Sequence, residues 1–101
     1  MPEIFEYLGI IMFFYSSEHE PIHVHGKYDG FQSKAEFFIT DGTIVEIKIK
    51  TIKGFKPLTG SKLNDFMDFL EKYGDKIVQK WIDYFVYHKH IDFERINTRI
   101  K

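Results

Sequence analysis

The residues with the clearest chemical potential in this chain are the two histidines of a His23-Val24-His25 run. The run lies in residues 22–28, where polar and apolar side chains alternate as they do in a half-buried strand. Side chains two residues apart on a strand point to the same face, so the two imidazoles would lie together. Such a pair can hold a metal ion, carry a proton or simply meet solvent. The sequence alone leaves these three alternatives open.

Acidic side chains on the neighbouring strands turn the histidine pair into a candidate metal site. An Asp-Gly pair at residues 29–30 indicates a two-residue hairpin, which places His23 opposite Glu36. At residues 40–42 a two-residue loop would mix polar and core faces, so we favour a three-residue loop, which places Glu36 opposite Glu46. Carboxylates side by side are destabilising unless a cation lies among them, and this mixed set suits Zn, Mn or Fe. The predicted ligands are His23, His25, Glu36 and Glu46. The alternative is that these groups only meet solvent.

Further candidate binding residues lie just before the histidine pair and in a lysine cluster further along the chain. They are His19, which precedes the pair, and the clustered lysines Lys48, Lys50 and Lys53. The lysines could contact the phosphates of a nucleic acid, but lysine on a strand edge also discourages pairing with other strands. The net charge is −1, from 14 basic and 15 acidic residues, so the whole chain gives no nucleic-acid signal.

Composition indicates a small globular protein. The 101 residues fit one domain, residues 1–101, and 44% of them are hydrophobic and 18% aromatic. This aromatic surplus also suggests a second apolar surface, for a partner. The chain has no cysteine, which excludes disulfides, thiol nucleophiles and thiolate metal sites and is compatible with the reducing cytosol. No apolar run is long enough to span a bilayer, so we expect a cytoplasmic protein without a membrane partner.

The pattern of apolar residues predicts an α+β fold. Strands are expected over about residues 3–50, in an antiparallel β-meander of four to five strands. The period then changes to helical over about residues 61–88, where Gly74 is expected to end one helix and Asp75 to cap the next. A short strand is expected at residues 91–96. The predicted architecture is therefore this meander, covered on one face by a C-terminal helical hairpin.

One motif resembles a known family. Three histidines and a proline form an H-x-P-x-H-x-H run at His19, Pro21, His23 and His25, after an opening MPEIF and a strand LGIIMFFYS. In these features the chain resembles a small bacterial family known as domain of unknown function 4160. The likeness runs through the first thirty residues and continues more loosely into the helical half, where Trp81 stands. This chain differs from the usual pattern at Ile22, where a second proline is typical, and in a longer stretch at residues 46–60.

The resemblance implies a small cytosolic protein, often encoded beside another small protein, and it brings no catalytic residues. Two functions therefore compete, and whether the chain is an enzyme stays open. The first is a binding or regulatory module that acts with a small protein partner, as in a toxin–antitoxin-like pair, or as a homo-oligomer. The alternative is a metal-dependent hydrolase or nuclease, in which His23 and His25, with Glu36 or Glu46, hold an ion that activates water. No G-x-S-x-G motif and no glycine-rich phosphate loop occurs.

Overall fold

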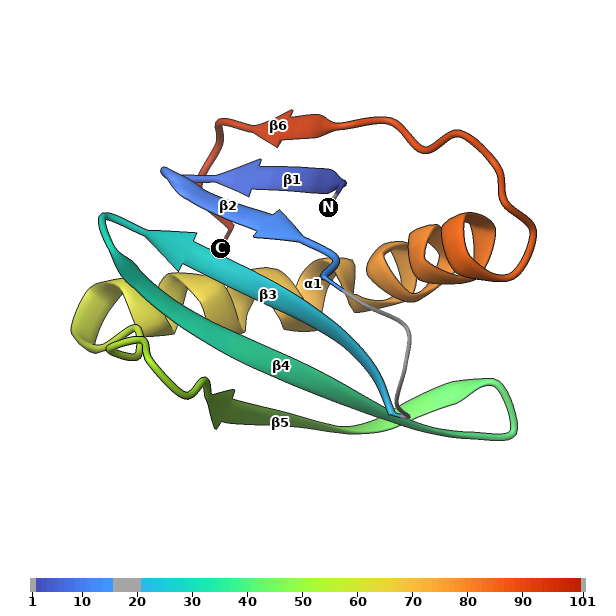
Figure 1. Ribbon diagram of the computed structural model, residues 1–101, viewed down its shortest axis with the longest axis horizontal. Helices are drawn as coiled ribbons and strands as arrows, with labels where there is room; N and C mark the ends of the chain where they lie inside the picture. Colours follow the sequence, from blue (N-terminus) through green and yellow to red (C-terminus); the bar gives the residue numbers. More distant parts are fainter. Residues whose placement is uncertain (1, 16–20, 101) are drawn as a thin grey trace.

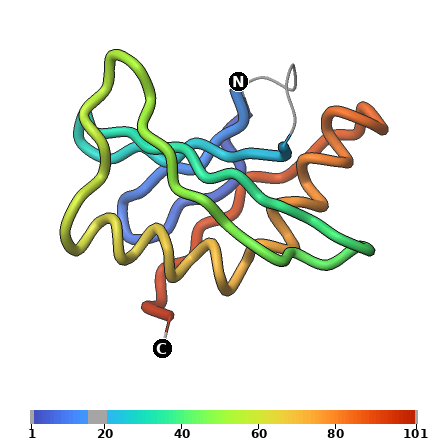
Figure 2. The backbone as a smooth tube through the Cα atoms, turned by 90° about the horizontal axis from the view of Figure 1, so that it is seen from below, coloured from blue at the N-terminus to red at the C-terminus, as the bar shows by residue number. Residues whose placement is uncertain are grey.

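The computed structural model describes residues 2–15 and 21–100 of the chain and contains one mixed sheet and one long helix. Along the chain the elements are β1 (Glu3–Tyr7), β2 (Ile10–Phe13), β3 (Ile22–Tyr28), β4 (Phe31–Thr40), β5 (Thr43–Thr51), α1 (Gly60–Phe85) and β6 (Glu94–Ile96). In the sheet the strands lie in the order β5-β4-β3-β2-β1-β6. Figures 1 and 2 show α1 along one face of this sheet. We call the opposite face the open face.

The α+β class is confirmed, but the sheet has more strands than the predicted four to five and is not wholly antiparallel. The described residues form six strands, and β6 pairs with β1 in parallel, with Phe5 opposite Glu94. The C-terminal segment is held there by side chains from the rest of the fold. Arg99 donates to the buried carboxylate of Asp65 at 2.9 Å, and the Tyr7 hydroxyl accepts from the Ile100 amide at 2.9 Å. These contacts join residues far apart in the sequence, so local patterns could not predict them.

The expected helical hairpin is wrong, because α1 runs without a break from Gly60 to Phe85. Gly74 does not end a helix but lies buried inside one, where α1 comes close to the sheet. A Cβ atom on Gly74 would lie 3.2 Å from Ile44 and 3.5 Å from Phe37. The glycine therefore serves close packing between helix and sheet, which a sequence pattern cannot distinguish from a helix end.

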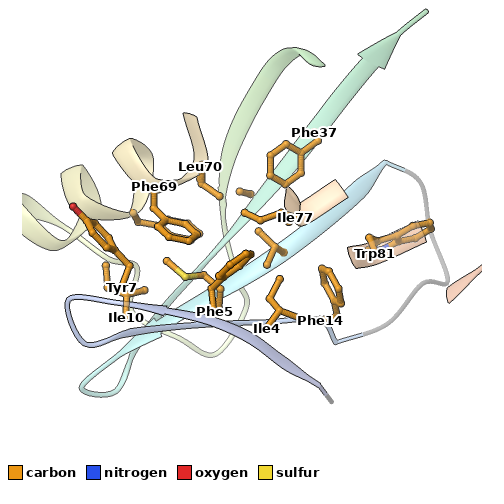
Figure 3. Packing of buried hydrophobic residues seen from close by; sticks show 14 of the residues in the cluster. Ile4, Phe5, Tyr7, Ile10, Phe14, Phe37, Phe69, Leu70, Ile77 and Trp81 are labelled. Carbon is orange, nitrogen blue, oxygen red and sulfur yellow. The ribbon is translucent and has the colours of Figure 1, made fainter. Parts of the chain in front are cut away.

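A second glycine marks another close contact between the sheet and the helix. A Cβ atom on Gly26 of β3 would lie only 2.5 Å from the ring of Phe66, which is fully buried. Gly26 and its alternate neighbour Val24 thus face α1, and the residues between and beside them face away. The core between the two layers is aromatic, as Figure 3 shows for Phe5, Phe14, Phe37, Phe69 and Trp81 among others.

The β4–β5 hairpin differs from the predicted register. Asp41 and Gly42, with φ of 52° and 78°, form a two-residue turn of the kind that both positive φ values require. The register then shifts between Phe38 and Ile39, because β5 carries one extra residue, a β-bulge at Val45. The bulge restores the match of apolar faces that we had expected a three-residue loop to provide, so Phe37 lies opposite Ile47.

Candidate functional site: the open face of the sheet

The histidine pair lies on the open face, as predicted. The Asp29-Gly30 turn sets the β3–β4 register, and His23 is opposite Glu36 while His25 is opposite Lys34. The ring of His25 is 5.8 Å from that of His23. His19, the third histidine of the motif, lies outside the described residues.

The acidic row predicted beside His23 does not form, and this is the main correction to the site. Because of the bulge in β5, Glu36 lies opposite Lys48, and Glu46 lies opposite Phe38. Glu36 therefore stands between an imidazole and an ammonium group, and it also lies 3.7 Å from the Nζ atom of Lys34. Its charge is balanced by these side chains, so the physical reason for expecting a cation is lost.

No group of three or more His, Cys, Asp or Glu side chains within residues 2–15 and 21–100 is arranged to hold a metal ion. His23 and His25 remain close together, but the structure adds no carboxylate pair to them. The predicted ligand set of His23, His25, Glu36 and Glu46 thus gains no support from the geometry at Glu46.

His25 is the most unusual group of the open face, because it is buried there without being in the main core. Only 7% of its surface is exposed. Its ring stacks on Phe13 of β2 at 5.2 Å and meets Tyr15 at 5.7 Å between ring centroids. The amide of Gln32 donates to its Nδ1 atom at 3.1 Å, which leaves the proton of the neutral ring on Nε2.

The environment of His25 keeps the ring uncharged at neutral pH. Its pKa is lowered from 6.5 to about 4, first by burial and then by the neighbouring charges of His23 and Lys34. His23 is held differently, since its Nδ1–H donates to the carbonyl of Pro21 at 3.1 Å. The His25 ring therefore behaves as a polar aromatic side chain, available for stacking and hydrogen bonding.

A pocket of about 360 Å³ opens beside His25, and we call it the aromatic pocket. Its lining comes from three strands and from the connection that follows β5, namely Phe13, Tyr15, His25, Lys27, Gln32, Ile52, Lys53 and Phe55. Figure 2 shows this connection, in yellow-green, rising to the side of the sheet away from α1. The loop thus provides one wall of a pocket whose floor is the sheet.

The charged groups at the aromatic pocket are lysines. Lys27 lies over the ring of Phe13 at 5.0 Å and 3.6 Å from a carboxylate oxygen of Glu3. Lys53 is exposed and lines the pocket from the connection that follows β5. Of the other predicted lysines, Lys48 lies over the ring of Phe38 at 5.1 Å and Lys50 lies opposite Lys34, both on the neighbouring β5. Their predicted contact with phosphates stays a prediction.

Sequence reasoning missed most of the aromatic pocket. The run at residues 10–15 is apolar on both faces, which we interpreted as a strand covered on two sides. In the structure its second apolar face, with Phe13 and Tyr15, lies beside the histidines instead. The signal was therefore present, since alternate residues of this run fall on the open face. Phe55 had no such signal, because it lies in an irregular connection.

The fold and site together define a small α+β protein with one helix-covered sheet face and one face that carries an aromatic pocket. The chain belongs to the family described as Domain of unknown function (DUF4160), whose model matches residues 9–82, well over half of its length. The match includes the histidine pair and most of α1. No curated protein and no solved structure matches this chain. No helix within the described part of the chain is long and apolar enough to cross a membrane.

Proposed function

We propose that this chain is a binding module that acts with a small protein partner and engages it through the aromatic pocket of the open face. A module of this kind would suit a regulatory pair of the toxin–antitoxin type, which the family resemblance implies. The absence of cysteine is compatible with a pair that works in the reducing cytosol.

The observation that carries this proposal is the exposure of aromatic rings around the pocket. Tyr15 is 63% exposed and Phe55 is 49% exposed, and both line the pocket next to the stacked rings of Phe13 and His25. Exposed aromatic side chains gathered at a concave site are typical of protein interfaces, where they anchor the contact.

Charges of both signs lie on the open face, which suits a protein partner. Lys27 and Lys34 already lie near Glu3 and Glu36, and the chain as a whole is slightly acidic. A nucleic-acid surface needs several lysines free to meet phosphates, whereas protein interfaces combine aromatic cores with mixed charges at the rim. The expected partner segment inserts an apolar or aromatic side chain into the pocket and carries a carboxylate toward Lys53.

The test begins with the tagged chain expressed in its native host. A protein that co-purifies in defined stoichiometry is identified by mass spectrometry, produced separately and titrated against the purified chain by calorimetry. We expect Tyr15→Ala and Phe55→Ala each to weaken this binding at least about tenfold, which corresponds to about 1.4 kcal/mol. The matched control is Tyr87→Ala, because Tyr87 is 61% exposed but does not line the pocket.

Three results would contradict the proposal. The first is that no partner co-purifies. The second is that the partner binds the two pocket variants as tightly as it binds the wild type. The third is that the control variant loses as much affinity as the pocket variants. If nucleic acid co-purifies and is lost in the pocket variants, the pocket is a binding site but its ligand is not a protein.

A further inference from the structure

The edge of the sheet formed by β5 carries a second interaction surface. This strand is nine residues long and ends the sheet, so one side of its backbone has no strand partner in the described structure (Figure 1). An edge of this length offers a row of amide and carbonyl groups to another strand. Val45 on this edge is 62% exposed, and it lines a surface groove of about 430 Å³ together with other residues of β5 and with Leu70 and Gly74 of α1.

The two faces of β5 differ in chemistry. Ile47 and Ile49 lie on the side of α1, opposite the buried Phe37 and Ala35 of β4. Lys48 lies on the open face, and Glu46 follows the same alternation. The lysines of β5 oppose pairing with a strand that places no acidic side chain opposite them, so a partner strand must supply a carboxylate there.

We propose that β5 pairs with β5 of a second copy of this chain, antiparallel and centred on Ile47. In this register Ile47 lies opposite its own counterpart, and Glu46 lies opposite Lys48 of the second copy. The twofold symmetry forms the Glu46–Lys48 pair twice.

Charge selects this register over its neighbours. In antiparallel pairing, two residues that face each other must direct their backbone groups to the same side, either both toward the other strand or both away from it, so the centre can move only in whole residues along the strand. Centring on Glu46 would place two carboxylates opposite each other, and centring on Lys48 would place two ammonium groups there. Directly opposed like charges destabilise a sheet, whereas opposite charges stabilise it.

The bulge does not prevent this contact. The β4–β5 register is regular from Glu46 to Thr51, and the disturbance lies before Glu46. The three central pairs of the proposed contact, formed by residues 46–48 of each copy, thus use regular strand. The symmetry axis stands perpendicular to the sheet, so both open faces, with their aromatic pockets, lie on the same side of the dimer. The pairing itself does not depend on what the aromatic pocket binds.

The first experiment measures the mass of the full chain by light scattering and analytical ultracentrifugation. We expect a dimer for the wild type. Glu46→Lys and Lys48→Glu should each raise the dimer dissociation constant at least about tenfold, because each replaces two attractive pairs by two repulsive ones. The double variant, Glu46→Lys with Lys48→Glu, should restore the dimer. Tyr15→Ala should leave it intact, which separates this proposal from that for the pocket.

The second experiment uses the absence of cysteine in this chain, so that a single introduced thiol is the only one present. With Ile47→Cys, the two thiols should lie across the symmetry axis, where opposed Cβ atoms are roughly 5 Å apart. Oxidised glutathione should then give a covalent dimer. Thr43→Cys is the control, because Thr43 lies four residues before Ile47 and beyond the bulge, so it would be far from its own counterpart in the second copy.

A wild-type chain that is monomeric at every concentration up to about 0.5 mM would overturn the proposal, since the dimer would then be weaker than about 4 to 5 kcal/mol. A dimer that the single charge variants leave unchanged, or that the double variant does not restore, would overturn it as well. Efficient cross-linking through Thr43→Cys but not through Ile47→Cys would show a different register.

Discussion

Acid should destabilise this protein because His25 takes up a proton more readily in the unfolded chain than in the folded one. Replacing His25 by an aromatic residue that does not titrate should remove this effect. The imidazole has a pKa of about 4 in the folded chain and 6.5 when unfolded. Between these values the unfolded chain takes up a proton that the folded chain does not, so the free energy of unfolding falls as the pH falls from about 6.5 to about 4. Below that range both states are protonated, and the loss stays constant.

The size of this loss follows from the shift of the pKa. One pKa unit corresponds to about 1.4 kcal/mol, so a shift from 6.5 to about 4 gives a full loss of about 3 kcal/mol. By proton linkage the loss relative to neutral pH is about 1 kcal/mol at about pH 5.5 and about 2 kcal/mol at about pH 4.5. The ring is 7% exposed, so solvent screening reduces these values little. For a domain of this size such a loss is a large share of the total stability.

The assay is urea unfolding of the wild type and of His25→Phe at several pH values, since phenylalanine keeps a ring next to Phe13 but does not titrate. The carboxylates contribute equally to both proteins, and their effect cancels in the difference. We expect the wild type to lose stability relative to the variant by the amounts given above. Parallel pH profiles of the two proteins would refute the buried, uncharged state of His25 and with it the description of the pocket floor.

Three further outcomes are expected. Gly26→Ala should cost about 1–3 kcal/mol in urea unfolding, because its Cβ atom meets the fixed ring of Phe66 at 2.5 Å, and a loss below about 0.5 kcal/mol would contradict this packing. Gly74→Ala should change the free energy of unfolding by less than about 1 kcal/mol, because the better helix propensity of alanine offsets a 3.2 Å contact with the half-buried Ile44. A loss as large as that of Gly26→Ala would contradict this expectation. Adding Zn²⁺ or Mn²⁺ to metal-free protein should leave the melting temperature unchanged, and a rise of several degrees that disappears in His23→Ala would restore the predicted metal site.

The part of the site that could be predicted from the sequence depends on local turn chemistry. The Asp29-Gly30 pair fixes a two-residue hairpin, and the pairing of His23 with Glu36 follows from it. The same reasoning failed one hairpin later, because a bulge at Val45 adds a residue within the strand. A bulge leaves no clear local signature, yet it moved Glu46 away from Glu36 and removed the reason to expect a metal.

The remaining differences come from contacts between distant parts of the chain. Gly74 was interpreted as the end of a helix, whereas its missing side chain lets α1 approach β4 and β5. The pairing of β6 with β1 joins residues almost ninety positions apart. The aromatic pocket likewise needs Phe55, brought to the open face by a connection without regular structure. Composition did predict a second apolar surface, but neither its place nor its lining.

NMR chemical-shift mapping of the chain with its purified partner shows whether the aromatic pocket of the open face binds that partner. We expect the largest shifts at Tyr15, His25, Lys53 and Phe55, which line the pocket. Shifts confined to the exposed side of α1, at residues such as Glu71 and Lys72, would contradict it.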